Sequence, residues 1–106
     1  MKRLDLAEIA RADLASIRRY STRTWGQDQT SKYMDALRDT TKGLVRGTAV
    51  TRARDDLRPG IQMATGGPHS IFFEADDSRS LVVRVLHDSM DYRRHLNPPA
   101  APDEGA

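Results

Sequence analysis

Side chains that could perform acid–base chemistry gather near the C-terminal end of the chain: Arg84, His87, Tyr92, Arg93 and His95. RNA hydrolysis without a metal needs a base for the 2′-hydroxyl, an acid for the leaving oxygen and cations for the charge of the phosphorane. Because histidine titrates near neutral pH, either His87 or His95 could serve as the acid or the base. The set is chemically sufficient for RNA cleavage, but it is not diagnostic of that activity.

A metal site is a second kind of chemistry that this region could support. His87, Asp91 and His95 recur at intervals of four residues, which would align them on one helical face and resemble a zinc site. His87, however, closes a run of β-branched residues that predicts a strand, so a helix through all three residues is not expected. We therefore expect no bound metal and no cofactor.

Two features around residue 68 have structural interpretations. The Gly66-Gly67 pair is not followed by a helix start with Lys-Ser/Thr, as a phosphate-binding loop would require, so it predicts a hairpin turn. His69 opens the next predicted strand, where we expect a polar structural role.

The composition fits one small domain. A chain of 106 residues suits a single domain, and 17 basic against 15 acidic residues leave a net charge of +2, which does not require a nucleic-acid partner. All basic residues except Lys2, Lys32 and Lys42 are arginines, whose planar fork suits bidentate pairing with carboxylates or phosphates. This bias fits an acidic protein partner or an RNA, and an arginine-rich proteome would explain it equally well.

Cellular location is constrained by what the sequence lacks. It contains no cysteine, which excludes disulfides and thiol chemistry. The segment Met1–Asp5 is too polar for a signal peptide, and no stretch approaches the length of a membrane span. We expect a cytoplasmic protein that does not bind a membrane.

The first half of the chain predicts a short strand and two helices. Polar and apolar residues alternate over Lys2–Leu6, which favours a strand. From Ala7 the period is helical up to a break at Gly26, with a stripe formed by Ala10, Leu14, Ile17 and Ser21. A second helix is expected from about Asp28, whose side chain could cap it, to Gly47, with a stripe formed by Tyr33, Leu37, Thr41 and Leu44. Two amphipathic helices with so short a connection should pack as an antiparallel hairpin.

The second half predicts a meander of strands. Residues 48–56 are polar and irregular, whereas 61–65, 69–74 and 81–87 have extended character and are separated by turns at 66–68 and 76–78. We expect an α+β domain over residues 1–96, in which the N-terminal strand and the helical hairpin pack on a curved antiparallel sheet, and a disordered tail over 97–106. The aromatic residues should anchor much of the packing: Tyr20, Trp25, Tyr33, Phe72, Phe73 and Tyr92.

This order of elements resembles the ParE/RelE toxin superfamily. Over residues 2–96 the local motifs resemble the ParE branch: Ala12-Asp13-Leu14 with Ile17 and Tyr20, Trp25-Gly26, Gln29 with Tyr33 and Leu37, and the segments 56–61, 67–73, 84–91 and 94–96. No single motif is specific, but their order and spacing together are. Family members often carry a proline and a Gly-Arg pair after the second helix, and here residues 47–54 replace them, which affects the contacts of that loop and not the fold.

The resemblance implies a type II toxin–antitoxin toxin. A ParD-like antitoxin would wrap the toxin with its C-terminal segment, and the toxin would inhibit DNA gyrase by binding rather than by catalysis. RelE-like relatives instead cleave messenger RNA on the ribosome, typically with a dense basic cluster that includes lysines, and this chain has no lysine after Lys42. A ribosome-dependent mRNA interferase is the alternative, and an inactive relative that only binds antitoxin is a third possibility. Direct nucleic-acid binding is not expected except through the antitoxin complex.

Two groups of residues are the candidates for these contacts. Toxicity is expected to depend on the last strand and its C-terminal extension, through Arg84, His87, Met90, Asp91 and Arg93. Antitoxin binding is expected at the rim of the helical hairpin, through Tyr20, Trp25, Tyr33 and Leu37.

Overall fold

A computed structural model describes residues 2–97 and shows the predicted order of strand, helices and meander. The elements are β1 (Arg3–Leu6), α1 (Glu8–Trp25), α2 (Gln27–Arg46), β2 (Thr51–Ala53), β3 (Gln62–Gly66), β4 (His69–Ala75), β5 (Arg79–His87) and α3 (Tyr92–Leu96). The α+β class is therefore confirmed. Of the predicted tail, residues 98–106 lie outside the described part of the chain.

The strands form one mixed sheet in the order β1-β5-β4-β3-β2. Strands β2 to β5 pair antiparallel as a meander, whereas β1 pairs parallel with β5, from Arg3 opposite Arg79 to Leu6 opposite Val82. The sheet is therefore mixed, and the expectation of a purely antiparallel sheet was wrong for β1. Parallel pairing needs a long connection between strands, and α1 and α2 lie between β1 and the meander along the chain. The prediction that 48–56 is wholly irregular was also wrong, since Thr51–Ala53 forms the exposed edge strand β2.

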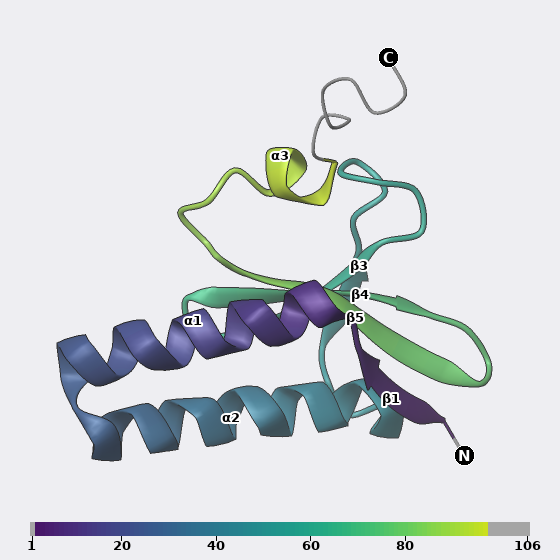
Figure 1. The fold of residues 1–106 in the computed structure, drawn as a ribbon. Helices are drawn as coiled ribbons and strands as arrows, with labels where there is room; N and C mark the ends of the chain where they lie inside the picture. Colours follow the sequence, from purple (N-terminus) through teal and green to yellow (C-terminus); the bar gives the residue numbers. More distant parts are fainter. Residues whose placement is uncertain (1, 98–106) are drawn as a thin grey trace.

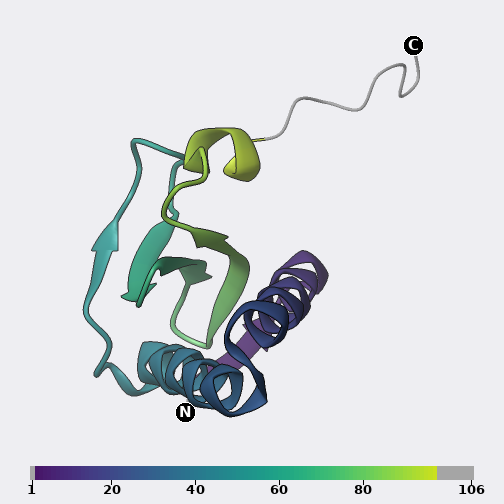
Figure 2. The ribbon, with the colours of Figure 1, turned by 90° about the vertical axis from the view of Figure 1, so that its left-hand side faces the viewer.

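Helices α1 and α2 lie side by side as a hairpin on one face of the sheet (Figures 1 and 2). A single residue, Gly26, separates them, and its positive φ of 89° is a conformation that glycine adopts without a steric penalty. The predicted cap at Asp28 was wrong, because α2 begins at Gln27 and Asp28 lies inside its first turn. An acidic residue there still interacts favourably with the free amides of the helix start.

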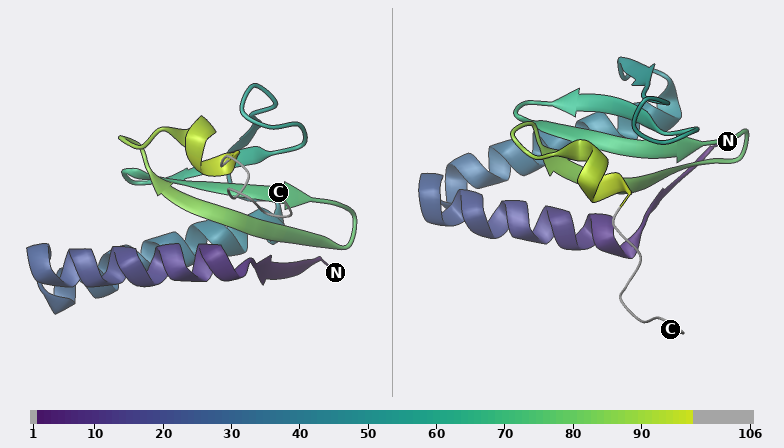
Figure 3. Two further views of the ribbon diagram at one scale, coloured as in Figure 1. Left: turned by 45° about the horizontal axis from the view of Figure 1, so that its top comes forward. Right: turned by 90° about the horizontal axis from the view of Figure 1, so that it is seen from above.

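The sheet is covered on both faces, which the sequence did not predict. Between the hairpin and the sheet lies a first core that includes both predicted helix stripes, with Ile71 and Val82 from the sheet fully buried. On the opposite face, α3 and the loop between β2 and β3 lie over the sheet (Figure 3). A second apolar cluster is formed there. Its buried members are Leu57, Ile61, Met63, Phe72, Leu86 and Leu96. Both faces of β3 are therefore buried, so Met63 and its neighbour Ala64 each lie in a core.

The aromatic residues divide between the interior and the surface. Phe72 and Phe73 are buried as expected, and Tyr33 and Tyr92 are partly buried against the two cores. The expectation that all six anchor the packing was wrong for the side chains of Tyr20 and Trp25, which are exposed at the far end of α1.

Helix α3 is held in place mainly through backbone carbonyls. Arg84 donates to the carbonyl of His95, and Arg58 donates to that of Leu96. In the other direction, Asn97 and Arg93 donate to carbonyls of the loop between β2 and β3 at distances of 2.6 Å. Leu96 adds an apolar contact, because it is buried in the second core.

A bidentate ion pair joins α1 to β5. Arg84 donates through Nε and Nη2 to the two carboxylate oxygens of Asp13, at 2.8 and 2.9 Å, and the backbone N–H of Val85 donates to Asp13 Oδ2 at 3.0 Å. Both side chains are mostly buried, at 17% and 15% exposure. Next to this pair, the register between β4 and β5 shifts by one residue, so that Phe72 faces Arg84 while Phe73 faces Val82.

Removing this pair should destabilise the fold. Asp13→Asn leaves a mostly buried guanidinium without its counter-charge, and we expect the free energy of unfolding to fall by about 2–4 kcal/mol in urea denaturation. The control is Asp35→Asn, which removes an exposed carboxylate 4.0 Å from Arg38 and should change stability by about 0.5 kcal/mol or less. Equal losses in the two variants would contradict the structural role given to Asp13.

Candidate functional site

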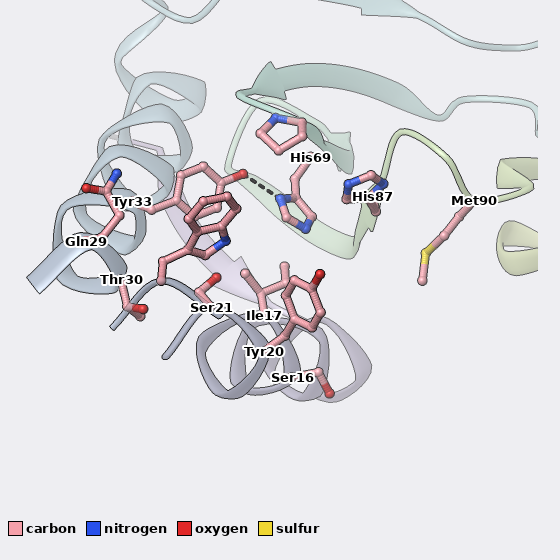
Figure 4. Close-up of a pocket in the computed structure, with 12 residues that line it drawn as sticks. Ser16, Ile17, Tyr20, Ser21, Gln29, Thr30, Tyr33, His69, His87 and Met90 are labelled. Carbon is pink, nitrogen blue, oxygen red and sulfur yellow. Dashed lines mark hydrogen bonds between the residues drawn. The ribbon is translucent and has the colours of Figure 1, made fainter. Parts of the chain in front are cut away.

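A groove of about 580 Å³ lies between the far end of the helical hairpin and the tips of the sheet. We call it the aromatic groove. Its lining residues come from α1, α2, the turn between β3 and β4, and the end of β5 (Figure 4); they are Ser16, Ile17, Tyr20, Ser21, Trp25, Gln29, Thr30, Tyr33, Pro68, His69, His87 and Met90. The groove thus brings together residues from both predicted groups, which the sequence had placed on separate surfaces.

The rim of the aromatic groove is apolar, exposed and uncharged. Trp25 is 67% exposed, Tyr20 60% and Met90 44%, which is unusual for side chains of this size. No lysine, arginine, aspartate or glutamate is among the residues of 2–97 that line the groove. Large exposed side chains gathered around a concavity are typical of a surface that binds another molecule.

The hydroxyl of Tyr33 fixes one wall of the groove. It donates to the carbonyl of Gly66 at 3.0 Å and lies 2.5 Å from Nδ1 of His69. The Nδ1 atom of His69 is thus engaged with Tyr33, and Nε2 is the ring nitrogen that remains for another partner. Burial raises the pKa of Tyr33 and lowers the pKa of His69, with His87 adding to the latter shift, so both side chains favour their neutral forms.

The turn at Gly67 is pressed against Tyr33. Gly67 has a φ of +62°, and a Cβ atom added there would lie 2.9 Å from Cε1 of the Tyr33 ring. Both the backbone conformation and the close approach therefore require glycine. The predicted hairpin turn is confirmed, but its contact with α2 had no signal in the sequence.

His87 faces His69 across the floor of the groove. The two rings are perpendicular, with their centroids 5.2 Å apart. The backbone N–H of Ser89 donates to Nδ1 of His87 at 3.0 Å, so Nδ1 holds a lone pair and neutral His87 carries its proton on Nε2. The Asp88 carboxylate also lies 3.2 Å from Nδ1, which would suit a protonated ring.

Three of the predicted toxicity residues do not line the groove. Arg84 is engaged with Asp13, as described above. Asp91 caps α3 by accepting from the N–H of Arg94 at 3.3 Å, and Arg93 donates to the carbonyl of Asp56. In the structure, the contacts of these three side chains stabilise the fold. A direct part in toxicity stays a prediction for each of them.

Leu37 does not belong to the rim of the hairpin. Its side chain is only 2% exposed and lies in the first core. Its expected place at the rim is therefore corrected, while a contact with an antitoxin stays a prediction. The position of Leu37 in the apolar stripe of α2 was compatible with the rim of the hairpin or with the core. In the structure this stripe contacts the sheet, so Leu37 lies in the core.

A second groove of about 410 Å³ runs between α1 and α2. We call it the arginine-rimmed groove. It is lined by apolar residues and by three arginines, in full Leu6, Leu14, Ala15, Arg18, Arg19, Met34, Leu37, Arg38 and Thr41. The two grooves have no lining residue in common, so the hairpin has one uncharged concave surface and one cationic one.

Comparison with known proteins identifies the family. The sequence model described as "ParE toxin of type II toxin-antitoxin system, parDE" matches residues 4–92. The chain belongs to the ParE toxin family. Among ParE relatives, the chain is 33% identical to Toxin ParE1 of Caulobacter vibrioides over 96 residues, covering 91% of this chain and 99% of that protein. It is also 33% identical to Toxin ParE1 of Mycobacterium tuberculosis over 92 residues, covering 86% and 94% of the two chains.

Solved structures show the same fold for ParE-type and related toxins. A structure described as the chromosomal ParDE toxin–antitoxin system from P. aeruginosa superposes with a TM-score of 0.71 at 22% identity, covering 82% of this chain and 96% of that chain. The E. coli DinJ-YafQ complex superposes with a TM-score of 0.61 at 11% identity, covering 84% and 96%. At these identities the likeness concerns the fold alone. Within residues 2–97 of this ParE-family chain, no helix has the length and apolarity needed to cross a membrane.

The partly buried His69 should make stability depend on pH. Its pKa in the folded protein lies below the ordinary value of 6.5, so the unfolded chain binds a proton more readily as pH falls. The stabilisation is present above about pH 6.5 and is lost as pH falls through the lower, folded-state value. We expect the free energy of unfolding to decline between pH 7.5 and 5, and His69→Gln to flatten this decline, with His95→Gln as the control. A decline of the same steepness in His69→Gln would contradict the assignment.

Proposed function

We propose that this ParE-family chain arrests growth by binding DNA gyrase and that a ParD-like antitoxin neutralises it. The family match over residues 4–92 carries this proposal, because the matched family consists of toxins of the parDE type. The concave, exposed and aromatic surface described above supports an action by binding. Gyrase acts on chromosomal DNA, so the proposal also places the protein in the cytoplasm.

The arrangement of the candidate catalytic residues supports binding over catalysis. Tyr92 bonds to Ser70 at 3.0 Å and packs edge-on against Phe72, with the ring centroids 4.9 Å apart. The donors of Arg84 are directed to Asp13 and to the carbonyl of His95. Of the proposed acid and base, His87 lies at the end of β5 in the aromatic groove, while His95 lies on α3. This distribution gives no open site in which acid, base and cation converge on one phosphate.

The arginine-rimmed groove supports an acidic antitoxin. Leu14 and Met34 offer apolar contacts to an amphipathic helix, and Arg18, Arg19 and Arg38 offer charge-assisted hydrogen bonds to its acidic side chains. The structure from P. aeruginosa is described as a ParDE system, which fits a partner of this kind. Antitoxin binding is therefore proposed at this groove, in place of the rim residues Tyr20, Trp25 and Tyr33 that the sequence predicted.

Purified components distinguish inhibition of gyrase from cleavage of messenger RNA. We expect the toxin to block supercoiling of relaxed plasmid by gyrase, with activity restored when equimolar antitoxin is added, and induction without antitoxin to arrest growth. Translating ribosomes incubated with the same toxin serve as the parallel assay. Transcripts cut in the ribosomal A-site while gyrase stays active would replace the proposal with the interferase alternative.

Charge reversal at the arginine-rimmed groove should slow capture by the antitoxin. For Arg18→Glu we expect the association rate in stopped-flow measurements to fall by about tenfold at low ionic strength, because steering of an acidic chain depends on these cations. The difference should shrink in about 0.5 M salt, where exposed charges are screened. The matched control is Arg11→Glu, which makes the same charge change on an exposed residue of α1 outside both grooves. Equal slowing in both variants would show that net charge, and not the groove, governs capture.

A further inference from the structure

The two sides of the helical hairpin differ in the partner chemistry that they suit. The arginine-rimmed groove contains three cations, whereas the lining of the aromatic groove has none and no carboxylate, although both use α1 and α2. An acidic segment would gain no ion pair in the aromatic groove and would lose hydration there. The segment that fits this groove is therefore uncharged and apolar.

The floor of the aromatic groove adds a polar requirement. The Nδ1 atom of each of the two histidine rings is already engaged, so Nε2 is the ring nitrogen that each can offer to a ligand. Neither Nε2 atom has a hydrogen-bond partner among residues 2–97. A peptide group or a side-chain amide carries one acceptor and one donor together, so it matches this pair of rings.

The rim has the character of an interface centre. Trp25 and Tyr20 on α1 and Met90 after β5 stand exposed on opposite walls, and aromatic residues with methionine are enriched where partners bury surface. His69, His87 and Tyr33 are ionisable side chains that line the aromatic groove. The carboxylate of Asp88 lies beside His87 but outside the lining. The groove is thus ready to accept an apolar side chain next to a backbone amide.

We propose that the aromatic groove binds the protein target of the toxin, by receiving an uncharged segment in which an apolar side chain inserts between Trp25 and Met90. This inference rests on the proposed function and assigns a surface to its target. The opposite charge character of the two grooves argues for the target as occupant, because the acidic antitoxin proposed above would occupy the cationic groove. His87 and Met90 take part through this groove.

Substitutions of exposed rim residues test this assignment without disturbing the core. Trp25→Ser and Met90→Ser remove apolar contacts from the two opposite walls, and Ile9→Ser is the matched control, since Ile9 is 51% exposed on α1 and lines neither groove. Three quantities are measured for each full-length variant: the concentration that half-inhibits purified gyrase, growth arrest at matched expression, and affinity for purified antitoxin. Thermal unfolding verifies that each variant is folded.

We expect both rim variants to need at least about tenfold more protein to inhibit gyrase and to arrest growth weakly, with antitoxin affinity within about twofold of wild type. Ile9→Ser should behave as wild type. A loss of antitoxin affinity in both rim variants would assign the groove to the antitoxin and overturn the inference. If the wild-type protein is a dimer and both rim variants are monomers, the groove belongs to a second copy of the chain, which would also overturn the inference. Unchanged growth arrest in both rim variants would overturn the inference as well.

The assays separate this inference from the proposed function. If the wild-type protein arrests growth but leaves gyrase active, the choice of gyrase fails, and the growth-arrest comparison between rim variants and control still decides the role of the groove. If the wild-type protein neither inhibits gyrase nor arrests growth, the proposed function fails and the inference fails with it.

Discussion

The carboxylate of Asp13 satisfies an edge of the sheet that no strand covers. Strand β1 pairs with β5 only as far as Val82, so the following part of β5 would otherwise face α1 with free backbone donors. Asp13 accepts the N–H of Val85 and both branches of the Arg84 guanidinium, and Arg84 in turn donates to the carbonyl of His95. One charged group on α1 therefore positions the end of β5, where His87 lies, and also α3. The part of the aromatic groove that the end of β5 contributes therefore depends on this connection.

The hairpin separates two concave surfaces because its helices are joined by one residue. With only Gly26 between them, α1 and α2 lie side by side, and the apolar stripes of both helices are used on the sheet. What remains exposed is a cationic groove between the helices and an uncharged groove toward the tips of the sheet. A small toxin can in this way offer chemically different surfaces to two protein partners without a second domain.

Periodicity predicted the elements well because each helix buries one stripe. Ala10 and Ile17 on α1 and Leu44 on α2 are buried as their spacing indicated. The site was predicted less well, because its geometry depends on contacts between distant segments, such as Tyr33 with the turn at Gly67. Spacing alone also cannot tell which apolar side chains of a helix are exposed. For this reason Leu37 was expected at the rim although it is buried, and Tyr20 and Trp25 were expected to anchor the packing although they are exposed.

The anchoring of α3 has an evolutionary consequence. Arg84 and Arg58 recognise the carbonyls of residues 95 and 96, a group that every amino acid carries. Mutations that alter the outward side chains of α3, at Arg94 for example, therefore leave these bonds in place. Lineages can diversify the chemical identity of this short helix while its location is inherited unchanged.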